Sequence, residues 1–418
     1  MSMSLNKEIP EPKMKNRILL FVLLFVFVIG GCKSRMREEI KTRYDRPLPL
    51  GSYALRRITN PYEIPDFTIA CLNTKDLRTA VTNSLNYLQK PSSHDFFPCG
   101  QITHSRTVES LKTFAELLDS GITGARLNEA IKQKFDVYIS VGCDDRGTVL
   151  FTGYYTPIFE ASLKRTREFQ YPLYKIPGDL VKGQDGVIYG RRMPDGQIQP
   201  YPSRAEIEDS KMLKGKELVW LKDPFEVYIA HVQGSARLRL PDGKLITVGY
   251  DANNGYEYRS VNQELVRDGK ISGDKISLSA MIDYFKMHPE QVNTYVRRNP
   301  RFVFFRIENG PPRGSLNEPV TAMRSIATDK SIFPRAALAF ITTTLPQDTG
   351  GNIVRRAYSG FALDQDTGGA IRAPGRCDVY MGQGDIAARM AGQTYQEGRL
   401  YYLFLKPTAN SENLLEVN

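Results

Sequence analysis

Helical and extended patterns occupy different parts of this chain, and that separation restricts its fold more than any other feature. Residues 75–135 carry apolar side chains at helical spacing, interrupted at Gly121 and Gly124. From Val149 onward, short apolar runs bounded by Gly, Pro, Asn and Asp predict strands. The strand-like runs include VLFTGYY, EVYIAHVQ, ARLRL, LITVGY, RFVFFRI, AALAFITTT and RLYYLFLK, and helical patches return at 277–298 and near DIAARMAG. Because no strand–helix–strand alternation occurs, we expect an α+β, β-rich fold with β-barrel-like parts.

The N-terminus carries a targeting pattern. A basic stretch precedes the apolar run from Ile18 to Ile29, which is too short to span a bilayer comfortably, and two glycines then lead to Cys32. This order resembles a bacterial lipoprotein signal, which is cut before the Cys, whose thiol then receives diacylglycerol. The resemblance implies a signal peptide over 1–31, lipidation of Cys32 and a tether over 32–60, with an uncleaved membrane anchor as the alternative. Since Lys33 follows the Cys where inner-membrane retention uses Asp, we expect anchoring in the outer membrane, facing the periplasm.

Four further cysteines remain if Cys32 carries lipid. They are Cys71, Cys99, Cys143 and Cys377. Disulfides are permitted outside the cytoplasm, but four cysteines allow three pairings or none, and the spacing does not choose among them.

Several functional classes lack their motifs. The formal charge of +10 suits a polyanionic partner, but no RNP motif, helix-turn-helix or paired Cys/His spacing supports nucleic acid. The four histidines show no HExxH spacing, and neither a GxSxG elbow nor a phosphate-binding glycine loop is present. We therefore expect no metal, no cofactor and no nucleic-acid partner. Of the catalytic chemistries considered, acid/base catalysis by Asp or Glu carboxylates is the one left.

The densest polar cluster outside the predicted helices is FALDQDTGGAIRAPGRCDVYMGQG, residues 361–384. In a strand over CDVY, Asp378 and Tyr380 would share one face. A carboxyl beside apolar walls and near Asp366 would have a raised pKa, as a general acid toward a glycosidic oxygen requires. Gly368 and Gly369 let the backbone approach a ligand or take up a positive φ. The alternative is a β-turn in which the Asp side chains cap backbone amides.

Ordered blocks along the chain carry a family resemblance. They are FTGYYTP, YPLYKIP, SRAEIE, VQGSARLRLPDG, GYEYRS, NPRFVFFR, SIATDKSI, DQDTGGAI and RCDVYMG. They span about 151 to 405 and resemble the membrane-bound lytic murein transglycosylase A family with its C-terminal three-aspartate domain. This chain departs from the family pattern in having Ala236, Met323 and Ala373 at positions where Gly is usual.

The resemblance implies a double-psi β-barrel catalytic domain built from both ends of the mature chain, with a smaller β-barrel-like domain inserted and a glycan groove between them. Mapped here, the barrel would use 61–157 and 309–418, and the insertion 158–308.

The resemblance also implies a reaction. Lytic transglycosylases cleave the β-1,4 bond between N-acetylmuramic acid and N-acetylglucosamine in peptidoglycan, using the muramic acid 6-hydroxyl in place of water. One acid/base group is enough for such an intramolecular attack. Asp378 matches the catalytic acid of the family, and Asp366 matches its neighbour, which would raise the pKa of Asp378 or orient sugar. Asp329 either contacts substrate or caps a turn.

Groove contacts are expected from Tyr155 and Thr156 at the start of the insertion and from Gln233, Gly234 and Ser235. Neighbouring strand residues face opposite ways, so one of Tyr154 and Tyr155 should be in the core.

Two other functions stay open: a hydrolytic glycosidase that uses both Asp366 and Asp378, and a non-catalytic peptidoglycan-binding lipoprotein. We expect a monomer that binds glycan strands and is attached to the membrane through Cys32.

Overall fold

The computed structural model describes residues 42–183, 186–273 and 278–407. The predicted signal peptide, the apolar run and Cys32 lie outside these residues. Within the part described, no helix is both long and apolar enough to cross a membrane.

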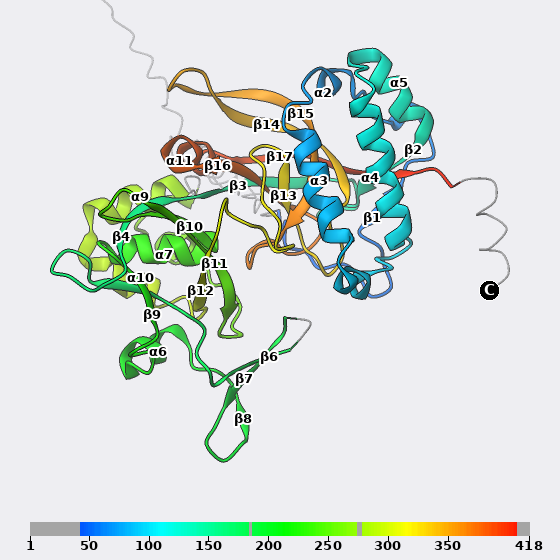
Figure 1. The fold of residues 1–418 in the computed structure, drawn as a ribbon. Coiled ribbons are helices and arrows are strands. Elements are labelled where there is room, and N and C mark those ends of the chain that lie inside the picture. The colour runs from blue at the N-terminus through cyan, green and yellow to red at the C-terminus, as the bar shows by residue number, and fades with distance from the viewer. Residues whose placement is uncertain (1–41, 184–185, 274–277, 408–418) are drawn as a thin grey trace, which may run out of the picture. The chain divides into compact units, whose positions relative to one another are not determined.

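An eight-stranded sheet forms the centre of the fold (Figure 1). Its strands are β1 (Leu55–Arg57), β2 (Phe135–Ser140), β3 (Val149–Thr156), β13 (Ser325–Ala327), β14 (Leu338–Asp348), β15 (Ile353–Asp366), β16 (Arg376–Gln383) and β17 (Tyr395–Leu405). The order is β1-β2-β17-β14-β15-β13-β16-β3, and β17 also pairs with β3. This extra pairing closes six of the strands into a barrel. The predicted β-rich α+β class with a barrel is therefore confirmed.

The barrel combines antiparallel and parallel neighbours. β15 runs parallel to β13, and β16 runs parallel to β3. Such pairs need long connections. The connection from β3 to β13 contains all of the second sheet described below, so the barrel draws its strands from two separate parts of the chain.

A layer of helices packs against one side of the barrel, drawn in blue and cyan in Figure 1. Its members are α2 (Thr68–Leu72), α3 (Leu77–Leu88), α4 (His104–Asp119) and α5 (Gly124–Lys134), with short 3-10 helices η1 (Pro61–Glu63) and η2 (Pro91–Phe96). Helix α4 begins where the Thr103 side chain accepts a hydrogen bond from the Arg106 amide. Its apolar face joins a core in which Phe67, Phe114 and Phe361 are fully buried. The helices predicted over 75–135 are thus confirmed.

The segment between the two barrel parts forms a second, six-stranded sheet in the order β12-β11-β10-β4-β9-β5. Its strands are β4 (Ile158–Ser162), β5 (Tyr171–Tyr174), β9 (Glu217–Leu221), β10 (Ser235–Arg239), β11 (Leu245–Asn253) and β12 (Val303–Glu308), and β6 (Leu180–Lys182), β7 (Ile188–Arg192) and β8 (Ile198–Gln199) form a separate small sheet. The outer strands β5 and β12 also approach one another. This sheet therefore curves as expected for a barrel-like insert.

Helices of the inserted segment pack beside this sheet. They are α6 (Arg204–Ser210), α7 (Pro224–Gln233), α8 (Val261–Arg267), α9 (Leu278–Met287), η4 (Pro289–Gln291) and α10 (Val292–Val296); α11 (Gly384–Gly392) follows β16. The prediction of a strand over EVYIAHVQ is wrong, because these residues form α7. The Asp223 side chain accepts from the Phe225 amide, Pro224 occupies the first turn, and Gly234 ends the helix at φ +74°.

Candidate active site

Four residues form one row across the barrel sheet. Ala327 on β13 pairs with Asp366 on one side and with Asp378 on the other, and Asp378 pairs with Thr152 on β3. Residues paired directly across strands project to the same face of a sheet. Both acidic side chains therefore lie on one face, separated by the methyl group of Ala327.

Asp378 is half-buried, and Cys377 and Val379 are fully buried on the opposite face, as expected for a strand over CDVY. Burial is the largest effect on the pKa of Asp378 and raises it, and the Asp366 charge raises it further. A hydrogen bond from Thr152 and the Arg376 charge act in the other direction. Among the described residues, none donates a hydrogen bond to the buried Oδ1 atom of Asp378. This carboxyl is therefore suited to hold a proton and to offer it to a ligand.

Asp366 has a different environment. Its Oδ1 atom accepts hydrogen bonds from the amides of Ser315 and Thr367, both at 2.8 Å. Burial raises the pKa of Asp366, whereas these two amides lower it. Amide donors favour the ionised form. Burial leaves the pKa of both carboxyls raised, but Asp366 accepts backbone amide hydrogen bonds whereas Oδ1 of Asp378 has no donor among the described residues.

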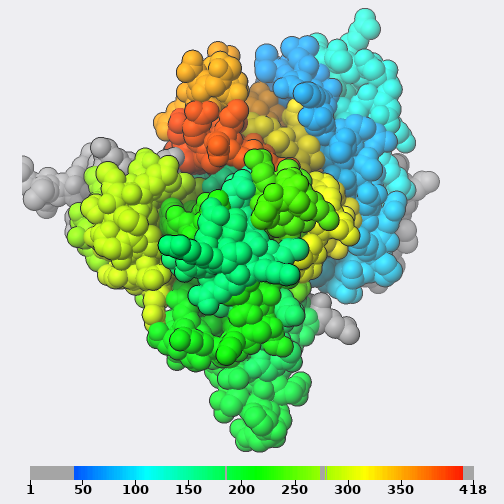
Figure 2. All heavy atoms as spheres, turned by 60° about the vertical axis from the view of Figure 1, so that its left-hand side comes forward, coloured from blue at the N-terminus to red at the C-terminus, as the bar shows by residue number. Residues whose placement is uncertain are grey.

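The helical layer holds the segment that reaches Asp366. The Asn83 side chain donates to Pro319 O at 2.9 Å, and Lys90 Nζ lies 2.5 Å from Glu318 Oε1. Figure 2 shows this yellow segment between the blue helices and the green insert. The sequence alone predicts no role for these helices. The structure gives them one, because they position the loop that carries Ser315.

The tyrosine pair on β3 divides between core and site. Tyr155 is 5% exposed and packs in the barrel core, and Thr156 is 1% exposed with its hydroxyl 2.9 Å from that of Tyr380. Tyr154 lies on the other face, and burial and the Asp366 charge raise its pKa. Its ring centroid is 5.1 Å from that of Tyr380. The aromatic side chain near the two acids is therefore Tyr154, two residues from Thr152, and not Tyr155.

The predicted Gln233, Gly234 and Ser235 lie where α7 passes into β10. Gln233 Oε1 accepts the Tyr155 amide at 3.0 Å, which ties the insert to β3. Gly234 donates its amide to Ala230 O, and Ser235 is 9% exposed. Of these three residues, Gln233 connects the insert to the barrel, and Gly234 ends α7.

Asp329 has both carboxyl oxygens occupied by the protein. Oδ1 accepts from the amide and hydroxyl of Ser331, and Oδ2 accepts from the Ala373 amide at 2.9 Å. This geometry favours the turn-capping alternative over a substrate contact. Asp329 thereby holds the 367–373 loop in place.

The glycine pair in this loop does not use a positive φ, since neither Gly368 nor Gly369 is among the residues with one. A Cβ atom at Gly369 would lie 3.3 Å from Tyr258 Cβ and 3.5 Å from Arg301 Nε, so Gly369 allows close packing against the insert. Positive φ values occur instead at Met323 (+60°) and Ala373 (+67°). These are two of the positions where the family pattern has glycine, and the backbone explains that preference.

A buried ion pair inside the barrel was not predicted. Lys330 Nζ contacts Asp364, and the hydroxyls of Thr328 and Tyr402 donate to Asp364 Oδ2 at 2.7 and 2.6 Å. Asp364 is fully buried, so this network satisfies a charge that would otherwise be costly. Within the described ranges the four remaining cysteines are free, and no cluster of three or more His, Cys, Asp or Glu is arranged to hold a metal.

Comparisons with known proteins agree with these features. Residues 150–306 match the family model described as the MltA specific insert domain, and residues 324–404 match the 3D domain. Membrane-bound lytic murein transglycosylase A of Escherichia coli K12 is 30% identical over 279 residues, covering 66% of this chain and 71% of the relative. The Vibrio cholerae protein of the same name is 30% identical over 274 residues, covering 63% and 68%.

Solved structures show the same fold. A membrane-bound lytic murein transglycosylase from Agrobacterium tumefaciens superposes with a TM-score of 0.70 at 23% identity, covering 86% of this chain and 99% of that one. Escherichia coli MltA with bound chitohexaose superposes with a TM-score of 0.65 at 26% identity, covering 87% and 99%. The resemblance inferred from the ordered sequence blocks is confirmed, and the chain belongs to the membrane-bound lytic murein transglycosylase A family.

Proposed function

We propose that this chain is a lytic transglycosylase of the cell envelope. It cleaves the β-1,4 bond between N-acetylmuramic acid and N-acetylglucosamine in peptidoglycan and leaves a 1,6-anhydromuramic acid end. The observation that carries this proposal is the half-buried Asp378 carboxyl, whose pKa is raised and whose Oδ1 atom has no donor in the described part of the chain. Relatives named lytic murein transglycosylase A support the same activity.

Asp378 carries out both proton transfers in this mechanism. Its protonated carboxyl donates to the glycosidic oxygen as the bond breaks, and the resulting carboxylate accepts the proton of the muramic acid 6-hydroxyl. The attack is intramolecular, so no second carboxylate is needed to activate water. Asp366 contributes its negative charge, which raises the pKa of Asp378.

Tyr154, beside both acids, offers an aromatic face for a sugar ring. Tyr155, Thr156, Gln233, Gly234 and Ser235 maintain the junction between barrel and insert that borders the glycan groove. Asp329, Gly368 and Gly369 shape the loop after Asp366.

The finer features predicted from the sequence belong to the same proposal. The enzyme is a monomer that binds peptidoglycan glycan strands, and a lipid on Cys32 attaches it to the outer membrane facing the periplasm. Its catalytic domain uses 61–157 and 309–418 as a double-psi barrel, with 158–308 inserted.

Digestion of purified peptidoglycan by the full-length chain in detergent tests the reaction. Mass spectrometry should show muropeptides lighter by one water than the hydrolytic products. Reducing ends would instead indicate the two-carboxylate glycosidase, and binding without release would indicate the non-catalytic lipoprotein. Asp378→Asn should lower turnover by about 10²–10⁴-fold. The matched control is Asp385→Asn, an exposed acid on α11, which should leave turnover unchanged.

A further inference from the structure

Arg301 is a partly buried cation without a carboxylate partner among the described residues. Within the described residues, the Arg301 guanidinium donates one hydrogen bond, from Nη1 to Tyr256 O at 2.9 Å. Burial is the largest effect on the pKa of Arg301 and lowers it; Tyr250 raises this pKa and the nearby Arg372 charge lowers it. The neighbouring Arg297 and Arg298, by contrast, pair with Asp209 and Asp268. Buried charges in proteins are normally paired, so Arg301 lacks a partner that a ligand could supply.

The guanidinium lies against the loop that leaves the active site. A Cβ atom at Gly369 would be 3.5 Å from Arg301 Nε and 3.7 Å from Arg301 Cζ. Gly369 is three residues after Asp366 in the sequence. Arg301 therefore extends from the insert to the loop that follows Asp366.

Buried polar side chains hold the backbone of Arg301 in place. Arg204 Nη2 donates to Arg301 O at 2.9 Å and contacts His231 Nδ1 at 3.0 Å, and the Val303 amide donates to the same His231 atom. Asn254 accepts the Phe302 amide and donates to Pro300 O. Arg204, His231 and Asn254 are 2%, 6% and 2% exposed.

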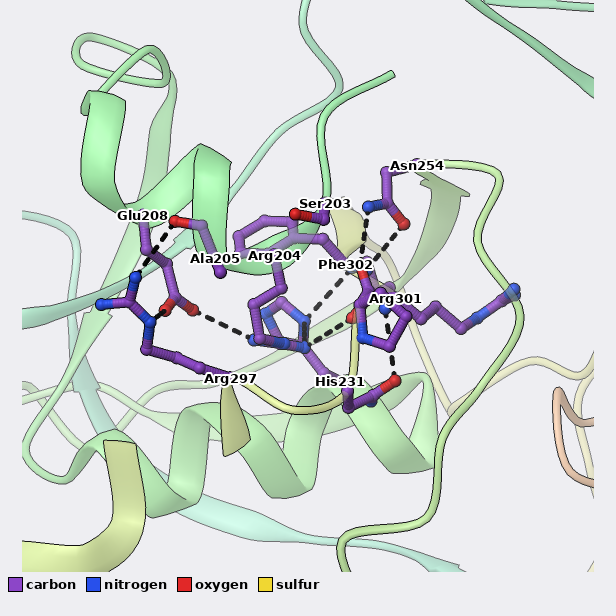
Figure 3. Close-up of polar contacts among 12 residues, drawn as sticks. Ser203, Arg204, Ala205, Glu208, His231, Asn254, Arg297, Arg301 and Phe302 are labelled. Carbon is purple, nitrogen blue, oxygen red and sulfur yellow. Dashed lines mark hydrogen bonds and ion pairs between the residues drawn. The ribbon is translucent and has the colours of Figure 1, made fainter. Parts of the chain in front are cut away.

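Figure 3 shows the Arg301 side chain directed away from this cluster, while its carbonyl is held within it. The cluster thus fixes the chain on both sides of Arg301 and leaves its guanidinium outside. Such preorganisation reduces the entropy lost when the side chain binds a ligand.

We propose that Arg301 binds a carboxylate carried by the muramic acid residue. This is either a carboxylate of the stem peptide or, on residues without a stem peptide, the free lactyl carboxylate. The planar guanidinium can donate two parallel hydrogen bonds to a carboxylate. Polymers of N-acetylglucosamine alone carry no carboxylate, so this contact selects peptidoglycan over neutral glycans. The inference rests on the proposed function and deepens it.

The test compares three ligands in the full-length chain and its Arg301→Gln and Arg301→Lys variants. The ligands are intact peptidoglycan, strands from which an amidase has removed the stem peptides, and neutral chitohexaose. For Arg301→Gln, KM on the carboxylate-bearing substrates should rise by about 10- to 100-fold, whereas the Kd for chitohexaose should stay within about twofold. Arg301→Lys should show a smaller rise in KM, because lysine keeps the positive charge but cannot donate the two parallel hydrogen bonds of a guanidinium. Arg239→Gln, an exposed arginine of β10, is the control and should change neither value.

The substrate whose KM rises most in Arg301→Gln identifies the source of the carboxylate. A loss confined to intact peptidoglycan assigns it to the stem peptide, and a loss confined to stripped strands assigns it to the lactyl group. Equal losses on chitohexaose and on peptidoglycan would overturn the proposal, as would unchanged KM values on both muramic acid substrates. If the wild-type chain binds strands but forms no anhydro ends, the proposed reaction fails. The Kd values for intact peptidoglycan, stripped strands and chitohexaose then decide the Arg301 contact by the same criteria.

Discussion

Lys90 links the helical layer to the proton chemistry of the site, and its replacement by Met tests that link. Lys90 Nζ lies 2.5 Å from Glu318 Oε1 and 3.5 Å from Leu316 O. The Glu318 side chain is 10% exposed and that of Lys90 is 38% exposed. Lys90→Met therefore leaves a nearly buried carboxylate without its cation.

The cost follows from this burial. Breaking a fully buried ion pair costs about 3–5 kcal/mol, and a single unsatisfied buried group about 1–3 kcal/mol. Since water reaches Lys90, we expect the lower range, which corresponds to a fall in Tm of about 1–4 °C for a chain of this size. Glu318 would also be drawn toward solvent, and the segment from Gly314 to Val320 would loosen. Ser315 would then donate less well to Asp366.

The catalytic consequence is a change in pH dependence. The Ser315 amide lowers the pKa of Asp366, so its loss raises that pKa. In the proposed mechanism, Asp366 is ionised and Asp378 is protonated in the active form. The acid limb of the rate profile should therefore move to higher pH, while the alkaline limb, governed by Asp378 while Asp366 remains ionised, should stay in place.

The assay is the initial rate of anhydro-muropeptide release from about pH 4 to 9, together with thermal unfolding. Lys112→Met removes a solvent-exposed lysine paired with Glu109 on α4 and should alter neither measurement. Adding Glu318→Leu to Lys90→Met should restore much of the Tm, because no lone charge remains. A lower Tm for Lys90→Met with an unmoved acid limb would refute the coupling to Asp366.

Three further predictions concern stability. Ala373→Gly should stabilise the fold by about 0.5–1 kcal/mol in urea titrations, because Ala373 has φ +67°; a loss of stability would contradict this. Asp364→Asn leaves Lys330 buried without its anion and should cost about 3–5 kcal/mol, which an unchanged urea midpoint would disprove. Because its pKa is raised, Asp378 binds its proton more tightly in the folded state than in the unfolded state. The contribution of Asp378 to the free energy of unfolding therefore falls as pH rises above the normal aspartate range. Asp378→Asn should therefore be more stable than wild type at pH 7, with the gap closing in acid; equal stability at pH 7 would contradict it.

Local patterns predicted those parts of the fold that depend on neighbouring residues. Alternation along CDVY placed Asp378 opposite Cys377, and the same rule divided Tyr154 from Tyr155. The rule failed at EVYIAHVQ, where apolar content suggested a strand. Its flanking residues Asp223 and Gly234 are helix start and stop signals, and they outweigh the composition.

Long-range contacts explain what local patterns missed. Asn83 and Pro319 are 236 positions apart, and Lys90 and Glu318 are 228 apart. Neither pair has a periodicity or motif that marks it, because the contacts join a side chain of one element to a loop of another. The helices were recognisable as helices, whereas their effect on Asp366 depends on where the fold places that loop.

The two unusual backbone positions show how sequence and structure complement one another. Met323 and Ala373 stand at positions where the family pattern usually has glycine. The sequence alone shows only that this glycine is absent. The structure shows that the left-handed conformation is kept at both positions. At Ala373 the amide donates to Asp329 Oδ2, so the strain is held by the same carboxylate that fixes the active-site loop. An Asp329→Asn variant tests whether the Asp329 carboxylate compensates for the backbone strain at Ala373. If it does, Ala373→Gly should raise the free energy of unfolding more in the Asp329→Asn variant than in the wild type.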